Sequence, residues 1–415
     1  MQGDMTCEPE VLQAAEWDAW SAHILRSFGA EEPPEEREVM RDLSRWERGL
    51  VVRDGSEIVG TAASLPFRMT VPGGSPVRAA GVTSVSTAPT HRRRGVLRSL
   101  MRRQLDDLHE AGEEPLAVLT ATEPAIYGRF GYGMASRKVD ARLEAGGVRL
   151  QLPPSAEKVR LRLVDEPALV REECEEVYAA CVPGRAGMLE RLPGWENLAL
   201  LDTAEQRHGA TALACVLAES EGRTTGYARY GLKRGRDERG VHAGTVLVRD
   251  LMALDPGSAG ALWQYLLDLD LMSTVHTGSL PVDDPLLEMA DDLRRCSPVL
   301  RDDLFCRPVE VGRALASRAY AQGVDVVLEV EDAFCPWNSG RWRLSGDESG
   351  AACEPTRDAA ELSLTVRELG AAYLGGTSLL SLERAGRVEE IRPGALRVAS
   401  AAFRTEPAPW VPHRF

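Results

Sequence analysis

The chain has 415 residues, of which 44% are hydrophobic and 27% are charged, and its formal net charge is −14. This composition is typical of a globular protein of two or three domains, each large enough to bury its own core. The acidic charge argues against nucleic-acid binding, and no apolar run approaches the roughly 18 residues of a membrane span. We therefore expect neither nucleic acid nor a membrane among the partners.

The first residues and the cysteines indicate a cytoplasmic protein. Residues 1–5 have neither a basic segment nor an apolar stretch, so we expect no secretory signal. The eight cysteines lack C-x-x-C spacing, which favours reduced thiols over disulfides or zinc. Because the seven histidines are equally dispersed, we predict no metal site. The negative charge would suit a cationic small substrate, although acidic surfaces are common among soluble proteins.

The N-terminal part of the chain predicts a helix followed by antiparallel strands. Apolar residues between Val11 and Arg26 favour a helix, and the acidic, proline-broken segment 28–36 favours a loop. An Asp-Gly turn between two β-rich runs is typical of a hairpin. A Pro-Gly-Gly-Ser-Pro turn then joins two further runs. The predicted strands cover residues 49–54, 58–65, 67–71 and 81–87.

A strand–turn–helix motif with three consecutive arginines at its turn comes next. Residues 81–87 are rich in β-branched side chains, and apolar residues from 96 to 108 recur at helical spacing. Residues 116–120 then favour a buried parallel strand. The Arg-Arg-Arg-Gly sequence of residues 92–95 thus lies at a helix N-terminus, where amide and guanidinium donors bind anions. We predict a pyrophosphate-binding turn, with a solvated basic turn as the alternative.

Two segments resemble a known enzyme family. Residues 88–95 (Ala-Pro-Thr-His-Arg-Arg-Arg-Gly) contain the R-x-x-G pattern that GNAT acetyltransferases use to hold acetyl-CoA, although Leu97 stands where that pattern has Gly or Ala. Residues 126–133 (Ile-Tyr-Gly-Arg-Phe-Gly-Tyr-Gly) add a second motif. Together they resemble the Eis (enhanced intracellular survival) branch of GNAT N-acetyltransferases. A P-loop and a Rossmann fingerprint are both missing at this turn.

The middle of the chain repeats the same order of elements. Residues 246–253 favour a strand, 254–258 a turn and 261–269 an apolar helix. This second turn carries Asp255 and no arginine, so it would repel a phosphate. We interpret it as a duplicated GNAT-like unit without a cofactor, and coincidence in a common β–turn–α pattern is the alternative.

The resemblance implies an α/β protein with three domains. These are a catalytic GNAT domain binding acetyl-CoA over residues 1–147, a degenerate GNAT-like domain without a cofactor site over 148–303, and a sterol-carrier-like α/β domain over 304–415. The last domain would send its C-terminus into the active site. Its predicted strands cover residues 324–330, 340–345 and 361–366, and its predicted helices cover residues 367–373 and 398–403.

The resemblance also implies the cofactor site. The strand before the arginine turn would lie along the pantetheine arm, the turn and first helical residues would hold the pyrophosphate, and the end of the next strand would complete the contacts. The expected residues are Val85, Ser86, Thr87, Arg93, Arg94, Gly95, Val96, Leu97, Arg98, Thr122 and Glu123.

Two residues are expected to carry the proton transfers. A phenol with a pKa of about 10 can protonate a leaving thiolate, and the resemblance selects Tyr127 over the nearby Tyr132 as general acid. It assigns the general base to the terminal carboxylate of Phe415. Because an α-carboxyl pKa of about 3.5 makes a feeble base, this role needs burial or a water relay. Arg414 departs from the acidic neighbour expected for a polyamine site.

We therefore expect an acetyl-CoA-dependent N-acetyltransferase that acetylates a cationic amine such as an aminoglycoside or a polyamine. Acidic residues Glu31, Glu32 and Glu35 could attract the cation. A protein lysine acetyltransferase and a non-catalytic CoA-sensing or lipid-binding protein are the alternatives. The family implies a homo-oligomer, hexameric in its members.

Overall fold

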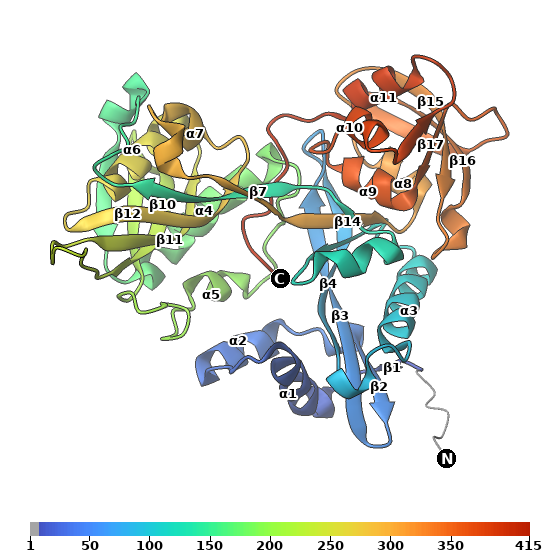
Figure 1. The fold of residues 1–415 in the computed structure, drawn as a ribbon, viewed down its shortest axis with the longest axis horizontal. Coiled ribbons are helices and arrows are strands. Elements are labelled where there is room, and N and C mark those ends of the chain that lie inside the picture. The colour runs from blue at the N-terminus through green and yellow to red at the C-terminus, as the bar shows by residue number, and fades with distance from the viewer. Residues whose placement is uncertain (1–7) are drawn as a thin grey trace. The chain divides into compact units, whose positions relative to one another are not determined.

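The computed structural model describes residues 8–415, which form two compact units. The first unit combines residues 8–136 with residues 303–415, and the second consists of residues 137–302. Each unit contains a seven-stranded sheet, and the C-terminal part of the first unit adds a five-stranded sheet (Figure 1). Within the described residues, no helix combines the length and the apolarity needed to cross a membrane.

The first sheet has the strand order β1-β2-β3-β4-β5-β14-β6, in which only β4 and β5 pair in parallel. Its strands are β1 (Glu10–Val11), β2 (Gly49–Asp54), β3 (Glu57–Thr70), β4 (Pro76–Thr87), β5 (Leu116–Thr120), β6 (Gly133–Met134) and β14 (Leu304–Pro308). Three helices accompany it: α1 (Trp17–Phe28), α2 (Pro34–Leu43) and α3 (Val96–Ala111).

The N-terminal helices differ from the prediction. Helix α1 begins at Trp17 rather than at Val11, because Glu10 and Val11 pair with β2 as a short strand. The predicted loop over 28–36 is wrong at its end, where α2 begins at Pro34. Proline is favoured at the first helical position, since its missing N–H would lack a helical partner there anyway.

Strand β3 also departs from the prediction, because it is one strand of 14 residues rather than two. It runs through Pro66, which pairs with Ala80 of β4. On its other side β3 pairs with β2 only as far as Ala63. Pro66 therefore lies where that side of β3 is an edge, which tolerates a residue without an N–H.

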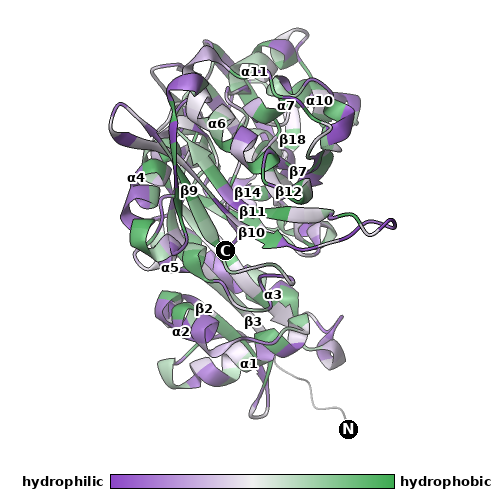
Figure 2. Ribbon diagram, turned by 90° about the vertical axis from the view of Figure 1, so that its left-hand side faces the viewer, coloured by the Kyte–Doolittle hydropathy of each residue, from purple (hydrophilic) through white to green (hydrophobic). Residues whose placement is uncertain are grey.

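Helix α3 follows the predicted spacing closely. It buries Val96, Leu100, Met101, Leu105 and Leu108 against the sheet, and Gly112 ends it in a left-handed conformation. Figure 2 shows hydrophobic colour along many strands and hydrophilic colour over many loops and outer helix faces. Burial of such a stripe, rather than helix propensity, fixes the position of the helix N-terminus beside β4.

The two seven-stranded sheets exchange strands along the sequence. Strand β7 (Arg137–Glu144) directly follows the first sheet's β6 in the chain, yet it pairs with β12 and β13 in the second sheet. Conversely, β14 follows the second unit in sequence but lies between β5 and β6 of the first sheet. The second compact unit therefore covers residues 137–302, whereas the predicted second domain covers residues 148–303.

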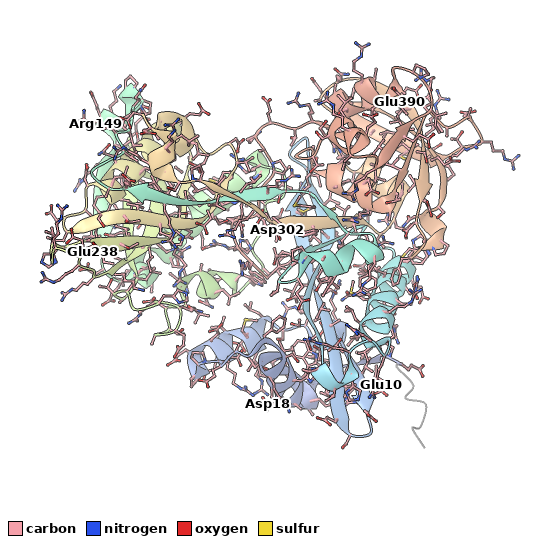
Figure 3. The ribbon with its side chains drawn as sticks, viewed as in Figure 1. Glu10, Asp18, Arg149, Glu238, Asp302 and Glu390 are labelled. Carbon is pink, nitrogen blue, oxygen red and sulfur yellow. The ribbon has the colours of Figure 1, made fainter. Side chains whose placement is uncertain are left out.

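The second sheet has the order β13-β7-β12-β11-β10-β9-β8. Asp302, labelled in Figure 3, ends β13 and the second unit. The predicted strand over 246–253 and helix over 261–269 are present, and the helix begins earlier, at Pro256. The remaining bounds are β8 (Arg160–Val164), β9 (Ala214–Ser220), β10 (Arg223–Lys233), β11 (Gly244–Ala253), β12 (Met272–Pro281), β13 (Val299–Asp302), α4 (Arg171–Cys181), α5 (Trp195–Leu200), α6 (Pro256–Leu267) and α7 (Pro285–Met289).

The C-terminal sheet has the order β17-β16-β15-β18-β19, with helices packed on it (Figure 1). The three predicted strands and two predicted helices are present, whereas α8, α10, β17 and β19 were not predicted. The bounds are β15 (Val324–Glu331), β16 (Gly340–Asp347), β17 (Gly350–Pro355), β18 (Leu362–Thr365), β19 (Val388–Glu390), α8 (Val311–Ala316), α9 (Val366–Tyr373), α10 (Leu379–Arg384) and α11 (Ala395–Phe403).

Candidate active site

The site begins where two parallel strands separate. Strands β4 and β5 pair only from Ala79 to Gly81 on the β4 side, and beyond Gly81 they no longer pair. On its other side, β4 carries a bulge next to β3, because Thr61 pairs with Ser86 while Ala63 pairs with Thr83. A bulge adds a residue to one strand and re-aims the side chains that follow. The end of β4 is thereby turned out of the regular ladder.

One buried hydroxyl holds this bulge. Ser84 has a φ of +54°, a conformation that is uncommon for a residue other than glycine. Thr61 Oγ1 donates a hydrogen bond to the Ser84 carbonyl at 2.7 Å. Ser86 Oγ lies 2.7 Å from Thr61 Oγ1 and donates to it, because the Thr61 proton is already used. Residues 85–87 are thus presented by hydrogen bonds rather than by strand pairing alone.

The arginine turn leads into an open helix N-terminus. Arg93 and Gly95 have φ values of +63° and +89°, and α3 begins at Val96 without a side-chain cap on Gly95. The first amides of a helix have no helical acceptor, so those of Val96, Leu97 and Arg98 remain available to a ligand. A Cβ at Gly95 would meet nothing within 4 Å, so the backbone conformation and not crowding favours glycine here.

His91 anchors the turn to the sheet. Its side chain is buried, and its Nε2 lies 3.0 Å from Asp54 Oδ2, at the β2–β3 turn. Its Nδ1 lies 2.9 Å from Thr90 Oγ1. The arginines after it are exposed, so they can approach an anion from solvent.

A cavity of about 560 Å³ joins these features. Most of the predicted cofactor residues line it, namely Val85, Ser86, Thr87, Arg93, Gly95, Val96, Leu97, Arg98 and Glu123. Arg94 and Thr122 were predicted as well but are not among the lining residues. Arg92, the first arginine of the predicted pyrophosphate-binding turn, also lines it. Other lining residues were not predicted to contact the cofactor, namely Ser27, Phe28, His91, Ile126, Arg129 and Phe130.

Tyr127 lines the cavity from a 3-10 segment that spans Pro124–Phe130. Burial of the side chain, and secondarily the charge of Glu123, raise the pKa of the Tyr127 phenol above its ordinary value. Tyr132 packs edge-on against it, with 6.1 Å between the ring centroids, but is fully buried and does not line the cavity. Of the two candidate phenols, only Tyr127 can therefore reach a ligand in the cavity.

The glycines around Tyr127 serve different purposes. Gly131 has a φ of +85° and ends the 3-10 segment. Gly133 is needed for close approach, because a Cβ there would lie 2.0 Å from the Arg367 carbonyl oxygen of α9. A Cβ at Gly128 would likewise lie 2.8 Å from Cζ of the Arg367 guanidinium. Helix α9 of the C-terminal part therefore supports the segment that carries Tyr127.

The C-terminal tail returns to the first sheet, where Figure 1 draws it in dark red beside β4. The ring of Phe415 packs edge-on against Phe67, with 5.0 Å between centroids. A Cβ at Gly81 would lie 3.1 Å from the Phe415 ring, which places the ring where β4 and β5 separate. Phe415 itself is not among the cavity-lining residues.

A buried carboxylate holds the tail. Asp303 Oδ2 accepts hydrogen bonds from the Val411 N–H at 3.1 Å and from Ser136 Oγ at 2.8 Å. The Leu304 N–H donates to Ser136 Oγ at 3.0 Å, which closes the network. All these groups are buried. Buried hydrogen bonds to a charged group are stronger than neutral ones, so Asp303 fixes the approach of the last residues.

The predicted acidic residues are not equivalent. Glu32 Oε2 pairs with Arg37 Nη1 at 3.5 Å, so its charge is partly balanced within the chain, and burial raises the pKa of its carboxyl. Glu31 and Glu35 are exposed, as is Arg414 in the tail. Among the described residues, no cluster of three or more His, Cys, Asp or Glu side chains is arranged to hold a metal ion.

The corresponding helix of the second unit has a closed N-terminus. Asp255 caps α6, and its carboxylate accepts from the Ser258 N–H at 2.9 Å and from Ser258 Oγ at 2.7 Å. The parallel strands β11 and β12 pair from Gly244 to Val248 on the β11 side and then separate. The strand arrangement of the first site thus recurs, but a carboxylate occupies the place of an anion.

Comparison with known proteins identifies the class. Residues 8–135 and 187–308 each match a family model described as an acetyltransferase (GNAT) domain. Residues 311–412 match a sterol carrier protein domain. The chain is therefore an acetyltransferase of α/β architecture, with two GNAT domains and a C-terminal sterol-carrier-like domain, as the sequence analysis predicted.

Full-length relatives identify the family. An uncharacterized N-acetyltransferase of Streptomyces coelicolor is 56% identical, covering 99% of this chain and 100% of that protein. The N-acetyltransferase Eis of Mycobacterium tuberculosis is 33% identical over 90% of each chain. The crystal structure of Eis1 from Mycobacterium abscessus, 32% identical, superposes with a TM-score of 0.83 over 98% of this chain and 100% of that one. The chain belongs to the Eis family of N-acetyltransferases.

Proposed function

We propose that this acetyltransferase moves an acetyl group from acetyl-CoA to a primary amine of a cationic small molecule, such as an aminoglycoside or a polyamine. The observation that carries the proposal is one shared cavity, lined by the open start of α3, by arginines of the turn and by Tyr127. This shared lining supports the proposal, because anion-binding groups and a proton donor would then surround one ligand. The net charge of −14 supports capture of a cation.

The residues fit acetyl-CoA as co-substrate. The amides at the start of α3, together with the Arg93 guanidinium, would hold the pyrophosphate through charge-assisted hydrogen bonds. Residues 85–87 would line the pantetheine arm, and Glu123 would contact it near Tyr127. When bound, the thioester supplies the activated acetyl group. Arg94 and Thr122 belong to the proposed set through the family resemblance, although they lie outside the cavity lining.

Tyr127 is the proposed general acid. Its raised pKa keeps the phenol protonated through neutral and moderately alkaline pH, so a proton is available for the departing thiolate. The hydrogen bond from the phenol to sulfur would strengthen as negative charge develops there, because an anion is a better acceptor than a neutral thioester. Tyr127 would then regain its proton from solvent.

The terminal carboxylate of Phe415 is the proposed general base. The packing of its ring at Phe67 and Gly81 supports this role, because it brings the chain end to the point where β4 and β5 separate. A carboxylate with a pKa of about 3.5 is a weak base for an ammonium ion near 10. It is better suited to the nitrogen of the tetrahedral intermediate, which is far more acidic than the free ammonium.

The other domains have supporting roles in this proposal. We assign the catalytic domain to residues 1–147, a GNAT-like domain without cofactor to 148–303, and a domain that delivers the tail to 304–415. The capped start of α6 supports the absence of a cofactor from the second domain. The family resemblance further suggests a cytoplasmic homo-oligomer, hexameric as in other members.

A thiol-release assay tests the function. Purified protein and acetyl-CoA would be mixed in turn with neomycin, spermidine and a lysine peptide, and free CoA would be measured. Release with neomycin or spermidine supports the proposal. Release only with the peptide would favour a protein lysine acetyltransferase. Binding of acetyl-CoA with no release of free CoA in the presence of any of the amines would indicate a non-catalytic CoA-binding protein.

A further inference from the structure

Helix α1 brings a serine–histidine pair to the cavity wall. Ser27 lies in the last turn of α1 and lines the cavity. One turn earlier, His23 is only 4% exposed, and its Nε2 lies 3.4 Å from Ser27 Oγ. Catalytic hydrogen bonds are often long before the substrate binds, so this distance is compatible with proton transfer in the complex.

The contacts of His23 suit a proton relay. The backbone of Ile58 on β3 is a hydrogen-bond partner of the ring. In the tautomer with its proton on Nδ1, Nε2 carries the lone pair and accepts from the Ser27 hydroxyl. A hydroxyl on the cavity wall with an imidazole behind it is the arrangement of an activated hydroxyl.

The charged groups around His23 keep the ring neutral. Burial lowers the pKa of His23, and Arg26 on the same helix lowers it further. Glu57 on β3 and the Ile58 backbone act in the opposite direction but do not outweigh burial. At neutral pH the imidazole is therefore free to take a proton.

The reaction itself needs more than one proton acceptor. An amine that arrives as an ammonium ion loses one proton before it can attack, and its nitrogen loses a second proton after the tetrahedral intermediate forms. Sulfur takes up only one proton as it leaves. The proposed function assigns the second deprotonation to Phe415 and the protonation of sulfur to Tyr127. It assigns no residue as proton acceptor for the first deprotonation.

We propose that Ser27 and His23 form a proton relay that deprotonates the substrate ammonium. An N–H bond of the ammonium breaks and its proton moves to Ser27 Oγ, while the Ser27 hydroxyl proton moves to His23 Nε2. The electron pair left on nitrogen attacks the thioester carbon. After the product leaves, the imidazolium returns its proton through Ser27 to water in the cavity. This inference rests on the proposed acetyl transfer to an amine.

Three variants test the relay: Ser27→Ala, His23→Asn and the double variant. The Asn amide can still bond to the Ile58 backbone but offers no acceptor at the position of Nε2. At about pH 6.5 each variant should lose about 10²-fold in kcat/KM for neomycin, or for spermidine if neomycin is not acetylated. The double variant should lose no more than the single ones, because the two residues act as a unit.

The pH dependence separates catalysis from structure. At about pH 9.5 the loss should shrink to less than about fivefold, because about a quarter of an amine with a pKa near 10 is then neutral, several hundred times more than at about pH 6.5, and neutral amine needs no relay. Acetyl-CoA affinity, measured by calorimetry, should stay within about twofold of the wild type in all variants. His109→Asn and Ser317→Ala, a hydrogen-bonded histidine and a serine at the C-cap of α8, both outside the cavity lining, are matched controls.

An equal loss at both pH values, no loss at either, or multiplicative losses in the double variant would each overturn the relay. If His23→Asn unfolds, Ser27→Ala still decides the question, since Ser27 is only half-buried. The proposed function and the relay are refuted by different results. Wild-type protein that acetylates neither amine refutes the proposed function, whereas normal wild-type turnover with unchanged variant profiles refutes only the relay.

Discussion

Helices α3 and α6 hold equivalent places in the two GNAT domains but begin differently. α3 follows Gly95, without a side-chain cap and next to three arginines, whereas α6 follows Asp255, whose carboxylate bonds to Ser258. A carboxylate at a helix start is, like a phosphate group, an anion that accepts hydrogen bonds from the first amides. The comparison teaches that one N-cap residue can leave the first amides of a helix open to an anion or satisfy them from within the chain.

The strands before the two helices show the same contrast. The β3–β4 hairpin of the first domain shifts register between Thr61 and Ala63. The β10–β11 hairpin of the second domain shifts register between Arg229 and Tyr230. In the first domain a small hydroxyl, that of Thr61, holds the bend and leaves the cavity open. In the second, the buried Arg229 guanidinium is paired with Asp250 at the bend. There, ionic side chains stabilise a domain that we propose to be structural.

The largest effect should come from the C-terminal tail, to which we assign the proposed general base of the first domain. Extending the chain beyond Phe415 with a C-terminal tag should abolish turnover in the thiol-release assay, because the carboxylate is moved away from the site. Acetyl-CoA affinity should remain nearly unchanged. The same tag at the N-terminus is the control, and full turnover with the C-terminal tag would remove the tail from the mechanism.

The next effect should follow from giving α3 the N-cap of α6. Gly95→Asp should weaken acetyl-CoA binding by about 10³-fold, because a carboxylate would occupy and repel the phosphate position. Gly95→Asn is the matched control, since it carries the same shape and tolerates a positive φ without the charge. Equal affinities of the two variants, measured by calorimetry, would show that the charge at this helix start does not matter.

A smaller loss is expected at the phenol. Tyr127→Phe should lower kcat by about 10²-fold, at the lower end of what a general acid contributes, with little change in acetyl-CoA affinity. Tyr132→Phe is the control, because Tyr132 has the same ring chemistry but is fully buried away from the cavity. If both variants kept the wild-type kcat, another group would have to protonate the thiolate.

The smallest effect should appear in the second domain. Asp255→Ala removes the cap of α6 and should lower the free energy of unfolding by about 1 kcal/mol, as loss of an N-cap does. Denaturant titration measures this change. Turnover and acetyl-CoA affinity should stay at wild-type values, and a clear loss of either would show that the second domain takes part in the reaction.

Local sequence signals were enough to predict the elements around the cavity. The spacing of apolar residues from 96 to 108 predicted α3, and the arginine turn lies directly before it. The cavity lining includes Tyr127 and most of the predicted cofactor residues. The sequence could bring these residues together because strand, turn and helix are contiguous in the chain, so neighbouring residues also meet in space. Their roles in binding and catalysis stay predictions.

Contacts between distant parts of the chain could not be predicted in this way. Ser27 reaches the cavity from α1, and Arg367 of α9 lies against the glycines that flank Tyr127. The exchange of β7 and β14 between the sheets leaves no periodic signal. β7 alternates as it would in either sheet, and β14 is buried along its whole length, as a central strand of either sheet would be. Pro34 shows a local limit, since a proline can begin a helix as readily as end one.

The stoichiometry of acetyl-CoA binding tests the central comparison most directly. Isothermal titration of the full-length protein with acetyl-CoA should give one site per chain, and Gly95→Asp should weaken binding at that site by about 10³-fold. No saturable heat in the wild type, or two sites per chain, would contradict an account in which α3 holds the cofactor and α6 is closed to it.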